Sequence, residues 1–283
     1  MTEKVMDIQM DKLIGFQNHP FQVKDDESLK MLCESIQDYG VLSPLLARPT
    51  TDGNYEIVSG HRRKAAAMKL GLKKLPVLVR EMTDDEAVIL MVDSNIQREN
   101  LLPSEKAYAY KMKLEAIKHQ GTRTDLTSCQ VGTRFRSDMR VASDTNESAR
   151  TVQRYIRLTY LQKPILDLVD DGRIAFSPAV ELSYLTKLEQ AELWDIMQSE
   201  DCTPSLSQAV RMKKLSKIAQ LTPELIFDIM SEEKANQKER IRIDVNQLRK
   251  YFPKSYTTAQ MENSILRMLE EQHKKKQRNK DAR

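Results

Sequence analysis

The chain has 283 residues, enough for two or three small domains, and aromatic residues make up only 6% with a single Trp, which argues against large β-sandwich cores. Its net charge of +4 decides little, but the positive charges are grouped. Residues 149–160 contain three arginines and no acid, and residues 273–283 contain six Lys or Arg and one Asp. Such clusters are typical of nucleic-acid binding. For the basic tail, a solvated or frayed end is an equal alternative.

The three cysteines, Cys33, Cys129 and Cys202, lie far apart with no metal-ligand spacing, so a structural zinc site is not expected. The odd cysteine count and the lack of a signal peptide predict a reduced, cytoplasmic protein. Apolar runs stay far below the roughly 20 residues of a membrane span, so no membrane partner is expected.

Residues 1–102 alternate between helical and strand patterns. Apolar spacing predicts a helix over 27–39 that Gly40 ends, and the capping box Thr83–Glu86 predicts a helix to about residue 97. The other predicted segments are an extended run at 41–48, a turn at 51–54, a strand at 55–58, a helix at 61–70, a strand at 75–81 and a helix at 104–119 that Gly121 ends. This order predicts a compact α/β domain.

A glycine turn joins the strand at 55–58 to the helix at 61–70. The turn reads Ser59-Gly60-His61-Arg62-Arg63. The free N–H groups of a helix N-terminus suit an anion, and arginine forks fit phosphate oxygens. Gly60 alone would be a weak signal, but with two arginines the segment predicts a phosphate site.

The rest of the chain is mostly helical. A loop or linker is expected at 121–134, and a charged linker at 232–240 precedes an edge strand at 240–245. Helices are predicted at 164–171, from 177 through Trp194, at 206–215, from 222, and from the capping box at 257–260 to about 271, after which the tail is expected to be disordered.

Residues 137–158 fit a helix-turn-helix. The motif requires a small residue, a turn residue four positions later, and apolar residues six and nine positions beyond it. Ala142, Asn146, Val152 and Tyr155 meet this spacing. Ser148 is the predicted N-cap of the second helix. The predicted DNA-binding residues are Ser148, Arg150, Thr151, Gln153, Arg154 and Arg157.

The polar residues of the second helix fall on one side of a helical wheel, opposite its apolar residues. Arg and Gln side chains suit guanine and adenine edges. An amphipathic helix with a solvated basic face is the alternative, and the coincidence of spacing and stripe favours DNA. Lys213, Lys214 and Lys217 could add phosphate contacts or form a solvated face.

These motifs, in this order, resemble the ParB family of chromosome and plasmid partition proteins over roughly residues 10–215. Residues 40–45 (GVLSPL), 59–66 (SGHRRKAA), and 94–98 (SNIQR) with 102–107 (LPSEKA) are similar to successive family motifs. The match most resembles ParB-like proteins of plasmids and integrative elements in Gram-positive bacteria.

The resemblance implies an α+β fold in successive parts. A mixed α/β domain of the ParB/sulfiredoxin type at 1–102 would bind nucleotide, and an all-α domain with the helix-turn-helix would span 103–220. Beyond the part that the resemblance covers, the residue pattern predicts a small, mostly helical C-terminal region at 221–272 and a basic disordered tail at 273–283.

The resemblance also implies a cytidine triphosphate (CTP) pocket with Mg²⁺. The residues carried over to the nucleotide site are Ser59, Gly60, His61, Arg62, Arg63, Asn95 and Arg98, with Asn95 as the Mg²⁺ ligand. The implied mechanism is a homodimeric, nucleotide-gated clamp that loads on double-stranded DNA at a palindromic, centromere-like site. The protein would be nucleoid-associated.

Two positions depart from the family pattern. His61 replaces a glutamate, and Ser94 replaces the acid linked to hydrolysis, with Asp93 one position away. One residue turns a helical side chain by about 100°, so CTP hydrolysis is left open. The N-terminus also lacks the basic peptide that would stimulate a ParA-like ATPase, so that partner is left open.

Two other function classes compete with the clamp. A helix-turn-helix transcription regulator would need no nucleotide. An enzyme is disfavoured, because Gly60 stands where sulfiredoxin has its reactive cysteine, and no carboxylate cluster for a two-metal nuclease is evident.

Overall fold

The computed structural model describes residues 4–98, 101–124, 137–145, 147–232, 248–253 and 255–281. These residues belong to two compact units, 1–232 and 233–283. The helices are α1 (Glu27–Tyr39), α2 (His61–Lys69), α3 (Asp84–Ile96), α4 (Pro103–Thr124), α5 (Ser137–Thr145), α6 (Ala149–Leu158), α7 (Lys163–Asp170), α8 (Phe176–Leu182), α9 (Lys187–Ser199), α10 (Leu206–Lys217), α11 (Pro223–Ser231) and α13 (Thr258–Asp281), with a 3-10 turn η1 at Met10–Lys12.

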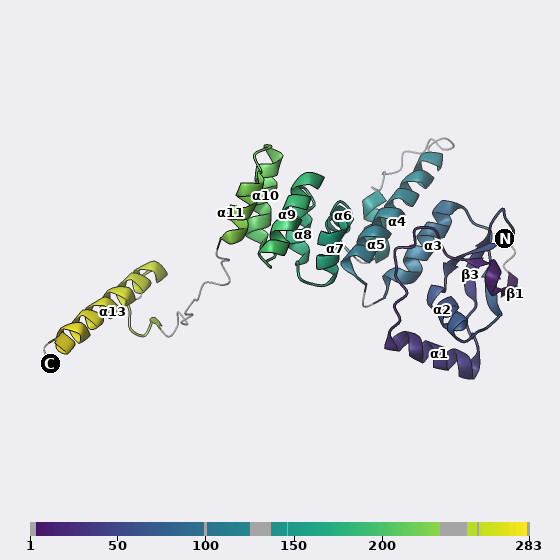
Figure 1. Cartoon of the computed structure of the whole chain (residues 1–283), viewed down its shortest axis with the longest axis horizontal. Coiled ribbons are helices and arrows are strands. Elements are labelled where there is room, and N and C mark those ends of the chain that lie inside the picture. Colours follow the sequence, from purple (N-terminus) through teal and green to yellow (C-terminus); the bar gives the residue numbers. More distant parts are fainter. Residues whose placement is uncertain are drawn as a thin grey trace. The chain divides into compact units, whose positions relative to one another are not determined.

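A five-stranded mixed sheet forms the core of the N-terminal part (Figure 1). Its strands are β1 (Lys4–Gln9), β2 (Leu13–Ile14), β3 (Leu45–Pro49), β4 (Tyr55–Ser59) and β5 (Lys74–Val79), in the spatial order β1-β5-β3-β4-β2. The pairs β1/β5 and β3/β4 are antiparallel, and β3/β5 and β2/β4 are parallel. Leu45, Ile57 and Val77 of the inner strands are completely buried.

Strands β3, β4 and β5 agree with the predicted segments, whereas β1 and β2 were not predicted. Both lie at the edges of the sheet. Ile8 is the buried residue of β1, and β2 has two residues. Edge strands with one buried side chain lack the alternating pattern that identifies a strand from sequence.

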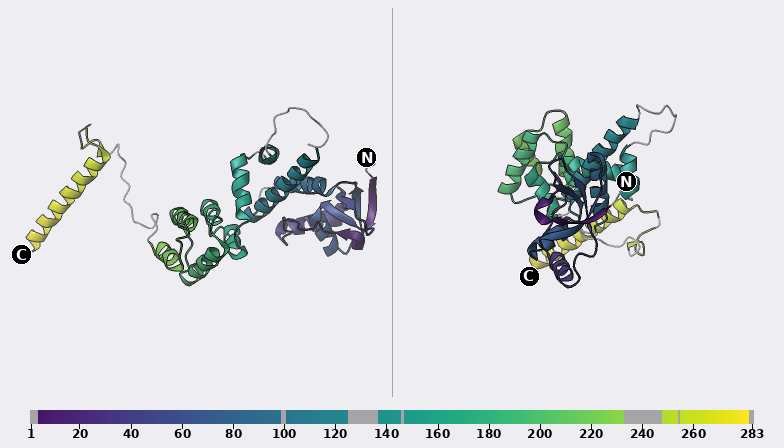
Figure 2. Two further views of the ribbon diagram at one scale, coloured as in Figure 1. Left: turned by 90° about the horizontal axis from the view of Figure 1, so that it is seen from above. Right: turned by 90° about the vertical axis from the view of Figure 1, so that its right-hand side faces the viewer.

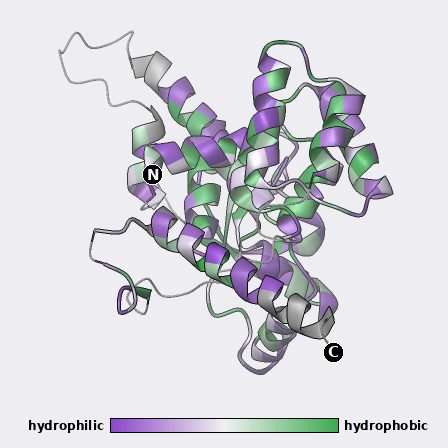
Figure 3. Cartoon of the chain, turned by 90° about the vertical axis from the view of Figure 1, so that its left-hand side faces the viewer, coloured by the Kyte–Doolittle hydropathy of each residue, from purple (hydrophilic) through white to green (hydrophobic). Residues whose placement is uncertain are grey.

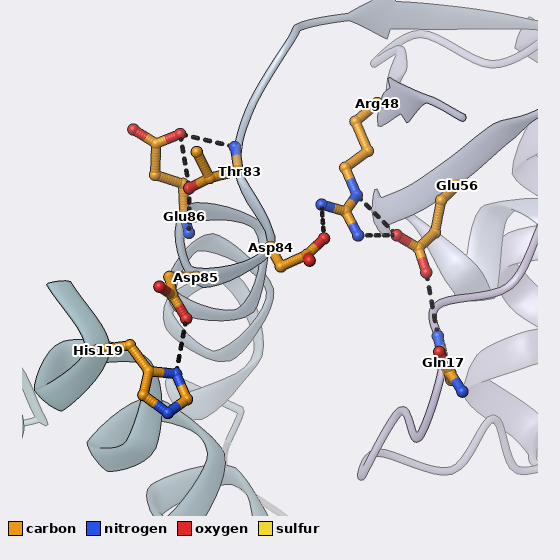
Figure 4. Close-up of polar contacts among 8 residues, drawn as sticks. All are labelled: Gln17, Arg48, Glu56, Thr83, Asp84, Asp85, Glu86 and His119. Atoms are coloured by element: carbon orange, nitrogen blue, oxygen red, sulfur yellow. Dashed lines mark hydrogen bonds and ion pairs between the residues drawn. The ribbon is translucent and has the colours of Figure 1, made fainter. Parts of the chain in front are cut away.

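Polar contacts fix the start of α3 against the sheet (Figure 4). The predicted capping box is present: the Thr83 N–H donates to Glu86 Oε2 (2.9 Å) and the Glu86 N–H to Thr83 Oγ1 (3.3 Å). Arg48 of β3 pairs with Asp84 (2.5 Å) and with Glu56 of β4 (2.6 Å). Helix α3 is thus held at the strands that lead into the Gly60 turn.

Helices α3 and α4 lie side by side, and α4 also packs against α5, α6 and α7 (Figures 1 and 2). The helix α4 continues to Thr124, past the stop predicted at Gly121. A single glycine in a helix costs only about 1 kcal/mol relative to Ala, so the flanking helix formers carry the helix through. Helices α7 to α11 enclose an apolar cluster that includes Leu166, Leu182 and Leu193.

The two helices of the predicted helix-turn-helix are α5 and α6. Ala142 is 6% exposed and Val152 is completely buried, and Tyr155 packs against the same cluster. The turn residue Asn146 lies outside the described residues.

In the second unit, α13 runs to Asp281, so the prediction of a disordered tail from residue 273 was wrong for 273–281. This segment has no glycine or proline and is rich in Lys, Gln and Arg, which are good helix formers. Hydrophilic residues predominate along α13 (Figure 3). The edge strand predicted at 240–245 lies outside the described residues.

Candidate functional site

The Gly60 turn requires a glycine. Gly60 is the N-cap of α2 and has a left-handed backbone, with φ of 109°. A Cβ atom at this position would lie 2.8 Å from Leu45 Cγ and 3.2 Å from an Arg63 side-chain nitrogen. Since Leu45 is completely buried in the sheet, it cannot move aside easily. The start of α2 therefore lies so close to β3 that position 60 has no room for a side chain.

We expect Gly60→Ala to lower the free energy of unfolding by about 1–3 kcal/mol, because the left-handed conformation and the close Leu45 contact both disfavour a side chain. Thermal melts would measure the change. Gly53→Ala is the matched control, with φ of 75° but nothing within 4 Å of its Cβ position. An equal loss in both variants would show that only the backbone conformation matters.

A cavity of about 570 Å³ opens beside this turn. It is lined by Gln22, Lys24, Asp26, Ser28, Arg62, Arg98, Leu101 and Glu105. This volume lies in the range of small-molecule sites. Of the predicted nucleotide-binding residues, Arg62 and Arg98 line it, although they are 36 positions apart in sequence.

Arg62 is held in place from α1. Its Nη2 donates to Ser28 Oγ (2.8 Å) and to Asp26 Oδ1 (3.2 Å). Asp26 is the N-cap of α1 and accepts from the Leu29 N–H. This hydrogen bond, and then Arg62, lower the pKa of Asp26. The guanidinium is thus oriented before any ligand arrives.

Positive charge exceeds negative charge in the cavity lining, where Lys24, Arg62 and Arg98 face Asp26 and Glu105. Burial, and next the charge of Arg62, lower the pKa of Arg98. Glu105 is tied to backbone, accepting from the N–H groups of Gln22 (2.8 Å) and Leu102 (3.0 Å). An anion with several charged oxygens would relieve the repulsion between the two arginines.

His61 lies against His19 at the base of the turn, with ring centroids 3.9 Å apart. The Phe16 N–H donates to His61 Nε2 (3.4 Å). Burial, then the neighbouring His19, Lys64 and Arg98, lower the pKa of His61 to about 3. His61 is therefore neutral at physiological pH, in a region that already holds several cations.

This neutral histidine should make the fold sensitive to acid. Below pH 6.5, unfolded chains bind a proton at His61 that folded chains bind only near pH 3, so stability falls as the pH drops through this window. We expect the melting temperature to fall less between pH 7 and pH 5 in His61→Gln than in wild type. Parallel pH profiles for the two proteins would contradict the assignment.

The other predicted nucleotide residues are placed differently. Ser59 pairs with Leu46 in the sheet. Arg63 donates to the carbonyl oxygens of Ser43 (2.5 Å) and Pro44 (2.8 Å), within the motif 40–45. Asn95 is 3% exposed, and its amide nitrogen donates to Met91 O (2.8 Å) and Ser94 Oγ (3.2 Å).

Asp93, the carboxylate next to Ser94, is engaged elsewhere. Its Oδ1 lies 2.5 Å from Lys113 Nζ of α4. Ser94 donates its hydroxyl to Met91 O (3.0 Å). Within the described residues, no three His, Cys, Asp or Glu side chains gather as a metal site.

Sequence reasoning missed the cavity residues contributed by the segment before α1 and by the start of α4, among them Lys24, Asp26 and Glu105. The capping pattern Asp26-x-x-Leu29 was visible, but capping residues occur at most helix starts. Nothing in the sequence alone linked Asp26 to Arg62.

The second candidate site is the exposed face of α6. Ser148 caps the helix, accepting from the Thr151 N–H (3.0 Å). Arg150 and Gln153 are exposed at its first turns. Arg154 is half-buried: its Nη2 donates to Ser177 Oγ (2.8 Å), and its guanidinium lies 4.8 Å from the Phe176 ring.

Arg157 is held more firmly. It donates to Ser183 Oγ (3.1 Å) and to Ser183 O (2.7 Å). Its guanidinium lies 4.4 Å from the ring of Tyr160 and 4.0 Å from the ring of Tyr184. These contacts join the end of α6 to the end of α8. The predicted DNA stripe thus divides into an exposed half and a half that packs on α8.

Among the described residues, no helix combines the length and the apolarity that a membrane span needs.

Residues 1–96 match the ParB N-terminal domain family. The chain is 33% identical over 211 residues to a probable chromosome 1-partitioning protein ParB of Deinococcus radiodurans, covering 75% of this chain and 66% of the relative. It is 31% identical over 212 residues to the chromosome-partitioning protein ParB of Myxococcus xanthus, covering 75% and 62%. The chain thus spans slightly less than two thirds of the length of these curated relatives.

Two solved structures of C-terminally truncated ParB from Caulobacter crescentus are also similar. One, in complex with the centromeric parS site, is 23% identical over 74% of this chain and 98% of its own, with a TM-score of 0.44. The other, in complex with CTP-gamma-S, is 26% identical over 68% and 97%, with a TM-score of 0.32.

Proposed function

Because the chain is a ParB-like protein, we propose that it is a sequence-specific DNA-binding protein of chromosome, plasmid or mobile-element partitioning, gated by CTP. The observation that carries this proposal is the cation-lined cavity at the Gly60 turn, in the same compact unit as the helix-turn-helix. Arg62, held by Asp26 and Ser28 near the start of α2, and Arg98 and Lys24 of the same lining supply the cations that a polyphosphate requires.

In this proposal Arg62 and Arg98 hold the triphosphate. The turn that positions Arg62 is formed by Ser59, Gly60, His61 and Arg63. Lys24 adds a third cation. Asn95 offers an amide oxygen to Mg²⁺, which takes most of its ligands from phosphates and water. The ion would neutralise phosphate charge beside the carboxylates of Asp26 and Glu105. Hydrolysis is not part of the proposal, since Ser94 has no carboxylate and Asp93 is bound to Lys113.

On the DNA side, Arg150 and Gln153 would contact base edges, while Ser148 and Thr151 would contact phosphates at the helix start. Arg154 and Arg157 would reach DNA only from positions fixed by α8. A homodimer would bind a palindromic DNA site and close around the DNA as a clamp. The protein would act in the cytoplasm, associated with the nucleoid. A ParA-like ATPase is a further partner to test.

Calorimetric titration of the full chain with CTP and Mg²⁺, with and without a DNA duplex enriched from a random pool by the chain itself, tests the proposal. Micromolar or tighter CTP binding and a discrete enriched sequence are expected. If CTP does not bind under either condition, gating by CTP is excluded, and sequence-specific DNA binding remains as the proposed function.

Two observations favour a transcription regulator without nucleotide as the second candidate. The Asn95 amide is already bonded within α3, and only two of the seven predicted nucleotide residues line the cavity. Chromatin mapping separates the two functions. Occupancy that spreads over kilobases around the site indicates a clamp, and a narrow peak indicates a regulator.

A further inference from the structure

Lys113 is a charged residue that neither proposed site uses. It lies on α4, and its side chain is completely buried. Its Nζ is 2.5 Å from Asp93 Oδ1 of α3 and 2.8 Å from Asp144 Oδ2 of α5. One ammonium therefore joins three helices. We refer to Lys113, Asp93 and Asp144 as the buried lysine triad.

Apolar packing also joins the three helices of the triad. Tyr110, Val141 and Val152 belong to one buried cluster, and Ile89 and Ile96 of α3 pack against it. A buried ammonium is very unfavourable without compensating carboxylates. The side chains of Asp93 and Asp144 are 42% and 50% exposed, so each reaches the ammonium from the protein surface.

The triad connects the two proposed sites. Asp93 stands two residues before Asn95, on the helix that leads to Arg98. Asp144 stands near the end of α5, the first helix of the helix-turn-helix. A shift of α3 relative to α5 would take one carboxylate away from the buried ammonium of Lys113. Because that loss is costly, a movement of one helix favours a matching movement of the other.

We propose that the buried lysine triad couples the nucleotide site to the helix-turn-helix, with Lys113 as a positioning residue. This inference rests on the proposed function. A ligand that repositions α3 at Asn95 and Arg98 changes the placement of α5 through Lys113, and DNA bound at the helix-turn-helix acts back on α3. Thermodynamic linkage requires the coupling to be reciprocal. A triad that only stabilised the fold would alter melting but leave the coupling unchanged.

The test is the coupling factor, defined as the ratio of the CTP dissociation constants measured without and with the enriched DNA duplex. In wild type we expect the factor to depart from 1 by about fivefold or more, the lower end of common allosteric couplings. In Lys113→Met the factor should fall to within about twofold of 1, with each separate affinity largely kept. This variant should fold, because Met fills the buried space of the lysine side chain and the half-exposed aspartates become hydrated.

Asp144→Asn provides a second route to the same result. It leaves Lys113 paired with Asp93 and removes the charge on α5 alone. Asp85→Asn is the matched control on α3, since Asp85 pairs with His119 of α4 (3.3 Å, Figure 4). Among the described residues, Asp85 has no ion pair with α5. The control should keep the wild-type coupling factor. Wild-type coupling in both triad variants would overturn the inference.

A nucleotide-free measurement separates this inference from the proposed function. Hydrogen exchange over residues 84–96 is followed when the duplex is added in the absence of CTP. Altered protection of α3 in wild type, lost in Lys113→Met, supports the triad even if CTP does not bind at all. Unchanged protection of α3 in wild type, or an equal change in the variant, overturns it.

Discussion

Arg62→Ala should weaken CTP binding by about 10- to 100-fold, because charge-assisted hydrogen bonds to phosphate each contribute about 1.5–3 kcal/mol. Arg62 is the cavity cation whose position is fixed by two side chains, Asp26 and Ser28. The substitution removes an oriented hydrogen-bond donor to the phosphates and leaves Arg98 and Lys24 in the cavity lining. Calorimetric titration with CTP and Mg²⁺ would measure the change.

The fold should survive this substitution. Asp26 keeps its hydrogen bond from the Leu29 N–H, which is the main cause of its lowered pKa, so the cap of α1 stays formed. Arg62→Lys keeps the charge but not the planar fork, and should recover only part of the affinity. Arg211→Ala, at an exposed arginine paired with Glu232, is the matched control. CTP affinity in Arg62→Ala equal to that of the control would exclude Arg62 from the site.

The features of the fold that could be predicted from the sequence are mostly local patterns. The capping box at Thr83 and the glycine after α1 each involve residues within one turn of one another, and both are present. The missed features depend on residues far apart in sequence. The edge strand β1 exists because β5 offers it a partner about 70 residues later, and its own sequence has one buried side chain.

The candidate sites show the same division. A strand, a glycine and two arginines predicted an anion site at α2, and Arg62 does line a cavity there. The spacing could not reveal that Arg63 is bonded to the carbonyls of residues 43 and 44, or that Lys24 and Glu105 complete the lining. Side-chain direction on a helix is predictable, but the identity of the opposing segment is a property of the tertiary fold.

The α6 stripe illustrates how tertiary contacts can reassign a predicted role. On a helical wheel Arg150, Arg154 and Arg157 are equivalent, since positions separated by three or four residues share a face. In the folded chain α8 and the two residues after it cover the later part of that face, where Ser177, Ser183 and Tyr184 contact the two later arginines. Only a test that separates DNA affinity from stability can assign each arginine.

Arg150→Ala should lower the affinity for the enriched DNA site by about 1–3 kcal/mol, as expected for an arginine that reads a base edge, and leave the melting temperature unchanged because the side chain is exposed. Arg157→Ala should act mainly on stability and reduce the DNA affinity less than Arg150→Ala does. Loss of two hydrogen bonds to Ser183 and of two aromatic contacts should lower the free energy of unfolding by about 1–3 kcal/mol.

DNA titrations at several salt concentrations, with melts of the same samples, would measure both effects. A base-reading arginine loses affinity for the specific site more than for random duplex, whereas a phosphate contact weakens both and reduces the salt dependence. If Arg157→Ala melts like wild type and loses specific affinity, its contacts with α8 must open when DNA binds. The guanidinium would then exchange its contacts with Ser183 and the two tyrosines for contacts with DNA. The contacts near α8 would belong to the DNA-free state alone.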